Sequence, residues 1–268
     1  MAKVTLTFDN GPTVMTPKVL DVLAERSVLA TFFVVGEQMA VPEMRAHAER
    51  AASEGHLIGN HGFTHARPPG QFLDPAAGVE EISRCQELIG ELAHRPDPLI
   101  RPFSDSGDVD RRVLDPTPAA STLSADARRY LEVGGFTIVM FKKLPGDFEG
   151  GDAWPARAVE QASGEDHSVV VLHDRQFPAD MLTLYGKADP DAPRSSALVG
   201  GAVPGLERFL DLAGQAGLEF VQEPPEDCVP MRAGRPSGAL DAIVTATPVA
   251  RTAPDFPPID RVQLGLAS

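Results

Sequence analysis

Polar side chains that can bind metals follow several apolar runs of this sequence, where the runs end. Asp9 and Asn10 come directly after "VTLTF" and precede a Gly-Pro turn, and His173 ends "SVVVLH". His61 and His65 lie in the Gly-containing segment "GNHGFTH". Two histidines and one oxygen ligand are a common zinc set in hydrolases, in which an open position holds water. The spacing therefore predicts a metal site to which the Asp9–Asn10 pair supplies the oxygen.

Two further segments place charged side chains at or just beyond the end of an apolar run. Arg101 ends "PLIR", and Asp147 and Asp152 lie in the Gly-rich "LPGDFEGGDAW". Each signal alone has a plain alternative, because Asp and Asn form turns, a histidine can cap a strand, and an arginine there is commonly a surface charge. In a βα-barrel, however, the carboxyl ends of the strands share one rim. Five runs that all end in polar groups therefore indicate one shared site.

Short apolar runs alternate with helical stretches, and this alternation must position the polar groups. Several runs are apolar almost throughout, which is typical of strands covered on both faces in parallel sheets. The expected strands are Val4–Phe8, Ala30–Val35, His56–Asn60, Pro98–Arg101, Phe136–Phe141, Ser168–His173 and Leu218–Val221. The expected helices are Thr16–Arg26, Pro42–Ser53, Pro75–Ala93, Ala125–Val133, Pro155–Ala162 and Pro204–Ala216. Seven strands alternating with helices predict an α/β fold with a closed or nearly closed barrel of parallel strands.

The composition limits the classes of partner. The chain has 268 residues, is 43% hydrophobic and carries a formal net charge of −14. Nucleic acid and anionic membranes repel an acidic protein, so we expect neither as a partner. No apolar run approaches the ~20 residues of a membrane span, and the start "MAKVTLTF" is typical of a strand rather than a secretory signal. We therefore expect a cytoplasmic protein.

Two segments interrupt the alternation. Residues 175–203 form a connection long enough to be a functional loop beside His173. Residues 223–268 are rich in Pro and have little periodicity, which predicts a tail that wraps over the surface or reaches a neighbouring subunit of a homodimer. The expected organisation is one barrel domain, 1–222, with the 175–203 insertion, followed by the 223–268 tail.

Five short motifs, in order, resemble those of the polysaccharide deacetylase family (carbohydrate esterase family four, the nodulation-deacetylase homology domain). "TFDNG" is similar to its Thr-Phe-Asp-Asp-Gly motif, "HGFTH" to its His-x-x-x-His and "VLHD" to its Leu-His ending. "RPF" and "GDF" are looser matches to its Arg-x-Pro and Asp-Trp motifs. The resemblance covers roughly Lys3 to Val221. It implies a distorted (β/α)7 barrel, which agrees with the seven expected strands.

The resemblance also implies catalytic roles. Asp9 would be the base, held in its charged form by Arg101. His173 would be the general acid, oriented by Asp147, with Asp152 as the alternative for that motif. Such a site hydrolyses an amide, because the base takes a proton as water attacks and the acid returns one to the leaving nitrogen. The implied substrate is a carbohydrate or small molecule, an N-acyl sugar or small N-acyl amine that is deacetylated at its C–N bond.

The metal site implied by the resemblance consists of Asn10, His61 and His65. A divalent ion is expected there, zinc first, with cobalt, manganese or nickel as alternatives. Because Asn10 stands where the family has an Asp and its carboxamide is neutral, we expect a weaker site, a different metal or none. "SDSGD" stands where the family has Pro-Tyr-Gly. The aromatic residues expected to line the substrate groove are Phe103, Phe148 and Trp154.

Three other interpretations remain open. The first is a cytoplasmic hydrolase of cyclic imides or small amides with little metal dependence. The second is a non-catalytic binding protein that kept the barrel, against which the presence of both Asp9 and His173 argues. The third is that the chain is another α/β barrel and that the resemblance is accidental. The presence of five motifs in order argues against this interpretation.

Overall fold

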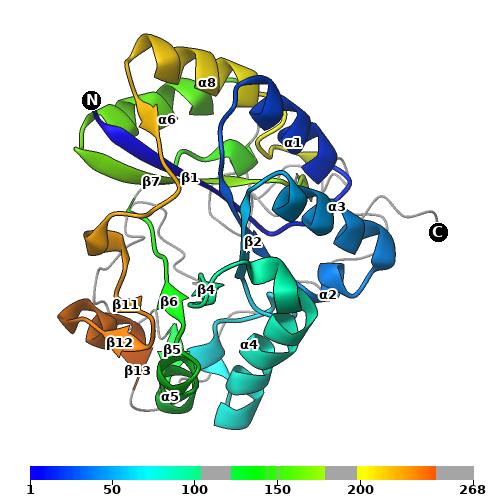
Figure 1. The fold of residues 1–268 in the computed structure, drawn as a ribbon, viewed down its shortest axis with the longest axis vertical. Helices are drawn as coiled ribbons and strands as arrows, with labels where there is room; N and C mark the ends of the chain where they lie inside the picture. The colour runs from blue at the N-terminus through cyan, green and yellow to red at the C-terminus, as the bar shows by residue number, and fades with distance from the viewer. Residues whose placement is uncertain (104–121, 143, 150, 179–197, 246–268) are drawn as a thin grey trace, which may run out of the picture.

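A curled, mostly parallel sheet lies at the centre of the computed structural model (Figure 1). The structure describes residues 1–103, 122–142, 144–149, 151–178 and 198–245. All seven expected strands are present: β1 (Lys3–Asp9), β2 (Thr31–Val34), β3 (Leu57–Asn60), β4 (Leu99–Ile100), β6 (Thr137–Ile138), β7 (His167–His173) and β10 (Glu219–Phe220). The described ladders between these strands are parallel. The predicted α/β barrel-like fold is confirmed.

Helices cover the outer face of the sheet (Figure 1). They are α1 (Thr16–Glu25), α2 (Gly36–Met39), α3 (Pro42–Ser53), α4 (Pro75–Ile89), α5 (Ala125–Val133), α6 (Trp154–Ser163) and α8 (Leu206–Gln215). The sequence predicts one helix from Pro75 to Ala93, but α4 ends at Ile89. Gly90 adopts a φ of 51°, a conformation that stops a helix, and a 3-10 turn follows. No helix in the described ranges is long and apolar enough to cross a membrane.

The two faces of β1 have different chemistry. Val4, Leu6 and Phe8 pack in the main core beneath the helices. By the two-residue period of a strand, Thr7 and Asp9 point the other way, into the barrel, and both are buried. The inner face of this central strand is therefore polar, whereas its outer face supplies the hydrophobic contacts that hold the helices.

The barrel is distorted around β1 and β7. β7 pairs with the whole length of one edge of β1. The other edge of β1 is shared by two strands: β10 pairs with Lys3–Val4, and β2 pairs with Thr7–Asp9. In the part of the chain that the structure describes, no ladder joins β6 to β7. Side chains instead pack β7 against the segment that follows β6, in a cluster of Leu144, Phe148, Val169, Val171, Phe177 and Cys228.

The segment after residue 222 belongs to the barrel as far as it is described. β11 (Met231–Arg232) pairs antiparallel with β6, and β12 (Arg235–Pro236) pairs with β11. Farther along, β13 (Val244–Thr245) pairs with β5 (Leu123–Ser124). The predicted boundary at 222 is therefore corrected: strand pairing continues beyond it, and Met231 is fully buried.

The remaining predictions on long segments fall mostly outside the described residues. The end of the predicted tail, 246–268, is not among them. Residues 179–197 of the expected loop and the segment "SDSGD" also lie outside the described residues. The two ends of the loop pair as a short antiparallel ladder of β8 (Phe177–Pro178) and β9 (Leu198–Val199).

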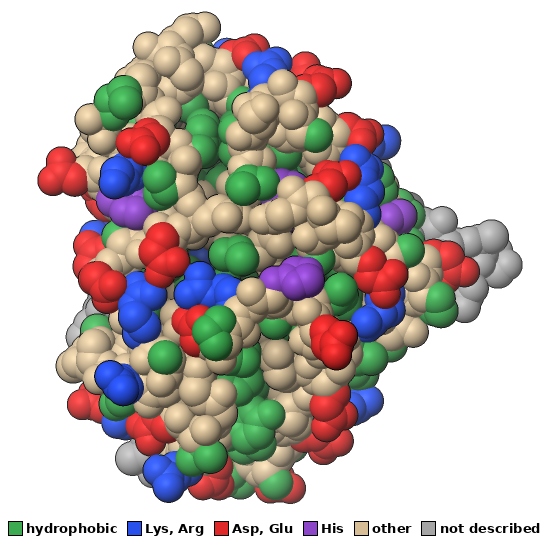
Figure 2. Space-filling model, viewed as in Figure 1, with side chains coloured by type: hydrophobic (Ala, Val, Ile, Leu, Met, Phe, Trp, Pro, Cys, Tyr) green, Lys and Arg blue, Asp and Glu red, His purple; other side chains and the backbone are tan. Residues whose placement is uncertain are grey.

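Charged side chains of both signs are interspersed on the face of the molecule shown in Figure 2. Arg50 of α3, for example, pairs with Asp21 of α1 and with Glu54, each at 2.7 Å. Exposed pairs of this kind contribute about 0–1 kcal/mol. The absence of a nucleic-acid partner stays a prediction from the net charge.

Replacing Met231 by Ala tests whether the segment after residue 222 is part of the core. Met231 packs in a cluster with Ile138 of β6 and Leu131 of α5, so its truncation should lower the free energy of unfolding by about 2–5 kcal/mol. Urea unfolding measures this loss. Val133→Ala at an exposed position of α5 is the control and should change stability by less than about 0.5 kcal/mol. Equal stability of the two variants would contradict the placement of Met231.

Candidate active site

The register of β1 and β7 places the predicted base and acid on neighbouring strands. Asp9 and His173 are direct partners in the ladder, each the last residue of its strand. Neighbouring strands lie about 4.8 Å apart. Two residues that are 164 positions apart in the sequence are thus brought to the same rim of the barrel.

A buried ion pair joins Asp9 to Arg101, which directly follows β4. Nη1 of Arg101 donates to Oδ1 of Asp9 at 2.7 Å and to the Thr7 hydroxyl at 2.8 Å, and Nε donates to the Val139 carbonyl at 3.0 Å. The guanidinium also lies 4.3 Å from the ring centroid of Phe33. The Arg101 side chain is 1% exposed, and these contacts replace part of its hydration, since Nη2 has no hydrogen-bond partner among the described residues. The pair fixes Asp9 with its second oxygen, Oδ2, 3.7 Å from Nε2 of His61.

The loop after β3 brings the two predicted imidazoles together. The ring centroids of His61 and His65 lie 4.9 Å apart. Nδ1 of His61 is 2.7 Å from the Arg101 carbonyl oxygen, so it carries the proton and donates, which leaves Nε2 with a free lone pair. Burial lowers the pKa of His61, and burial together with the neighbouring His61 lowers the pKa of His65 well below its ordinary value. Both rings are therefore neutral near pH 7, the form that binds metals.

Asp147 holds His173 by two hydrogen bonds. Its Oδ1 lies 2.9 Å from Nδ1 of His173, and its Oδ2 accepts from the His173 backbone N–H at 2.7 Å. Asp147 is fully buried, so its carboxylate has little freedom to turn away. Asp152, the alternative, is exposed and pairs with Arg208 on the surface. The geometry selects Asp147 as the residue that orients His173.

The sequence and fold match known proteins. Residues 2–115 match the family model described as "Polysaccharide deacetylase". A chitooligosaccharide deacetylase from Rhizobium leguminosarum bv. phaseoli is 31% identical over 206 residues, which cover 69% of this chain and 87% of that protein. The chain belongs to the polysaccharide deacetylase family. It spans between 36% and 60% of the length of four other curated relatives that it matches.

Solved structures of deacetylases share the fold. The Bc1960 peptidoglycan N-acetylglucosamine deacetylase is 26% identical with a TM-score of 0.57, over 82% of this chain and 85% of that chain. A family 4 acetyl xylan esterase from Clostridium thermocellum is 23% identical with a TM-score of 0.53, over 81% of this chain and 86% of that chain. The esterase was solved in complex with a cobalt ion, and members of the family are metal-dependent.

The side chains of Asn10, His61 and His65 suit such a metal in this deacetylase-family chain. Oδ1 of Asn10 is buried and has no hydrogen-bond partner among the described residues, so an amide oxygen is left to accept from or bind to another group. The neutral imidazoles supply two nitrogen donors. Within the described residues no three His, Cys, Asp or Glu side chains form a metal cluster. The third donor that the family resemblance implies, Asn10, is an amide instead of a carboxylate.

Two of the three predicted groove aromatics lie at the site. The ring centroid of Phe103 is 4.0 Å from that of His65, and the Phe148 ring stands edge-on to His173 at 5.8 Å. The prediction for Trp154 is wrong. Its indole is buried between α6 and α8, 5.9 Å from Phe209, because it is the first residue of α6 and faces the core. Phe177, which the sequence did not single out, lies 5.1 Å from His173 instead.

Asp174 is a second residue that the sequence did not single out, although it directly follows His173. Its Oδ2 accepts from the Thr16 hydroxyl at 2.6 Å, and its carbonyl accepts from the Thr13 hydroxyl. The carboxyl also packs against Gly11, where a Cβ atom would lie 2.1 Å from Oδ2. Asp174 thus ties the loop after β1 to the end of β7. Burial raises its pKa to about 7.

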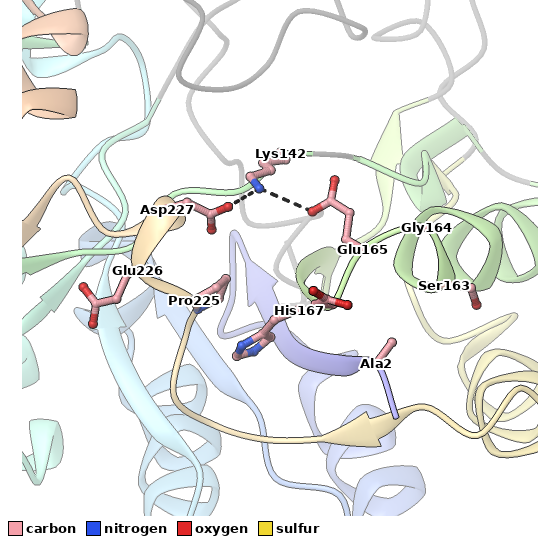
Figure 3. Close-up of a pocket in the computed structure, with 10 residues that line it drawn as sticks. Ala2, Lys142, Ser163, Gly164, Glu165, His167, Pro225, Glu226 and Asp227 are labelled. Atoms are coloured by element: carbon pink, nitrogen blue, oxygen red, sulfur yellow. Dashed lines mark hydrogen bonds and ion pairs between the residues drawn. The ribbon is translucent and has the colours of Figure 1, made fainter.

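A separate cavity of about 770 Å³ lies at the other end of the barrel (Figure 3). Lys142 pairs there with Glu165 at 3.4 Å and also with Asp227. His167, which begins β7, lines this cavity, whereas His173 ends the strand. The cavity therefore faces the amino ends of the strands, and none of the candidate catalytic residues lines it. In barrels that end serves stability rather than catalysis.

Replacing Asp174 by Asn should change how stability depends on pH. The native pKa of about 7 lies above the ordinary value of 3.8, so the native protein holds a proton that the unfolded chain releases. The stability linked to this proton is complete below about pH 4 and is lost as the pH rises through about 7. Urea unfolding across this range should show a smaller loss in Asp174→Asn than in the native protein. Asp152→Asn, on the surface, should follow the native protein; identical curves for both variants would contradict the assignment.

Proposed function

We propose that this chain hydrolyses the amide bond of an N-acyl sugar and removes the acetyl group from an N-acetylated hexosamine or its oligomers. The convergence of three units at one rim carries the proposal: the Asp9–Arg101 ion pair, the imidazoles of His61 and His65, and the Asp147–His173 pair. Relatives named chitooligosaccharide deacetylase and peptidoglycan N-acetylglucosamine deacetylase support this class of substrate.

The carboxylate of Asp9 acts as the general base. Arg101 occupies Oδ1, so Oδ2 on the His61 side is the oxygen that accepts a proton from the attacking water. Asn10, His61 and His65 would hold a divalent metal, zinc by preference, and such an ion when bound polarises the acyl oxygen and acidifies water. Because Asn10 is neutral, this ion is held with less charge compensation than a carboxylate would give.

His173 acts as the general acid for the leaving nitrogen. Asp147 accepts the hydrogen bond from Nδ1, which fixes the orientation and the tautomer of the ring. The opposite nitrogen, Nε2, is then the one that delivers a proton to the amine as the C–N bond breaks. The rings of Phe148 and Phe177 stand edge-on to His173 and hold its plane in place.

The other interpretations predict different results in a substrate panel. A small-amide or cyclic-imide hydrolase would act on cyclic amides and leave N-acetylated sugars intact, whereas a non-catalytic relative would turn over neither. The complete Asp147–His173 pair favours catalysis, because a binding protein needs no oriented acid. The cytoplasmic location and the homodimer stay predictions.

Asp9→Asn should abolish deacetylation, with a loss of about 10²–10⁴-fold in kcat, because the base is removed while the hydrogen bond from Arg101 can be kept. Release of acetate from N-acetylglucosamine oligomers measures the effect, with small cyclic amides assayed in parallel. Asp152→Asn is the matched control and should keep full activity. Native-like activity of Asp9→Asn would exclude Asp9 as the base.

Asn10→Asp should tighten metal binding, because a carboxylate adds a negative charge to the two neutral imidazoles. Titration calorimetry with Zn²⁺ on metal-free protein gives the dissociation constants of both forms. His61→Ala should lose binding in either background. An unchanged affinity in Asn10→Asp would mean that position 10 does not face the metal.

A further inference from the structure

Glu81 of α4 places a buried carboxylate against the loop that carries the two imidazoles. Its Oε2 accepts from the backbone N–H of Thr64 at 2.9 Å and of Phe63 at 3.2 Å, and its Oε1 accepts from the Thr64 hydroxyl at 3.0 Å. The residue is 8% exposed and lies on the core-facing stripe of α4 with Ile82 and Cys85. Helix packing alone would favour an apolar side chain here.

Other elements hold the rest of this loop: the N–H of His61 donates to the Val34 carbonyl of β2 at 2.9 Å, and Nδ1 of His61 donates to the Arg101 carbonyl at 2.7 Å. The Asn60 side chain accepts from Gly62 N–H at 2.9 Å. The first amides of α2 donate to the loop carbonyls, Gly36 to Gly62 and Glu37 to Phe63, each at 2.9 Å. Glu81 is the described acceptor for the backbone N–H groups of Phe63 and Thr64, and without it these half-buried donors would lose that partner.

His65 follows this clamped segment directly and has a left-handed backbone, with φ of 57°. A residue other than glycine keeps such a conformation only where its surroundings hold it. The hydrogen bonds to Phe63 and Thr64 fix the two residues that precede His65. His61 lies at the other end of the same five-residue segment, so the clamp sets the separation of the two rings.

We infer that Glu81 is a positioning residue for the imidazole pair: it holds the loop through Phe63 and Thr64 and thereby sets the geometry of His61 and His65. Its three described hydrogen bonds go to Phe63 and Thr64. The inference rests on the proposed function only in treating the two histidines as metal ligands, and its main readout does not need the metal.

Three variants separate positioning from stability. Glu81→Ala removes all three hydrogen bonds. Glu81→Gln keeps them, because its carbonyl oxygen can accept from the two N–H groups while the Thr64 hydroxyl turns to accept from its amide. Asp74→Ala removes the N-cap hydrogen bond to Ala76 and weakens the same helix without touching the loop.

The experiment records the ring resonances of His61 and His65 and the amide exchange of Phe63 and Thr64 by NMR, together with Tm and Zn²⁺ affinity. Glu81→Ala should shift both ring signals, lose protection at both amides and weaken Zn²⁺ binding by about 10–100-fold, the size of outer-shell effects. Asp74→Ala should lower Tm and leave the ring signals in place, and Glu81→Gln should restore the native spectrum.

Two results separate the failure of this inference from that of the proposed function. If Glu81→Ala lowers Tm but keeps the native ring signals and amide protection, Glu81 is only structural and the inference is overturned. If the native protein takes up no Zn²⁺, the metal part of the proposed function fails, and the ring signals still decide the role of Glu81.

Discussion

The buried ion pair between Asp9 and Arg101 is the interaction on which the rest of the site depends. Two charges removed from water destabilise a fold unless each is paired and hydrogen-bonded. Here Thr7, the Val139 carbonyl and the ring of Phe33 supply most of this compensation, while Nη2 of Arg101 has no hydrogen-bond partner among the described residues. This explains why the inner face of β1 is polar while its outer face is hydrophobic. It also explains why β4, which has only two residues, has a defined place: Arg101 anchors its end to β1.

The same arginine connects the proposed base to the proposed metal ligands. Its backbone carbonyl fixes the tautomer of His61 while its guanidinium fixes the carboxylate of Asp9. Within this group the local charge is nearly balanced, since Asp9 is paired and both imidazoles are neutral. Asn10 adds no charge. A metal bound there would keep more of its own charge than with a carboxylate ligand, which favours acidification of bound water at the expense of affinity.

The interruption of the sheet between β6 and β7 gives His173 its surroundings. No ladder joins these strands within the described residues, and where one would close a regular barrel, aromatic side chains pack instead, with Phe148 and Phe177 reaching the imidazole. β6 pairs with β4 on one edge and with β11 on the other. The segment after residue 222 therefore covers an edge of β6 that would otherwise be unpaired. The departure from a regular barrel thus creates both the aromatic wall of the site and the place for the segment after residue 222.

The sequence by itself determined the seven strands and the polar groups at their ends, because apolar runs and turn residues are local signals. The candidate residues Asp9, Asn10, His61, His65 and His173 could be proposed for that reason. Tertiary structure alone decided between Asp147 and Asp152, since only the fold brings one of them to His173. It also decided against Trp154, whose position in the core follows from the packing of α6 on α8. Glu81 and Asp174 carry no local signal of their roles, because each acts on a loop that is distant in sequence and near only after folding.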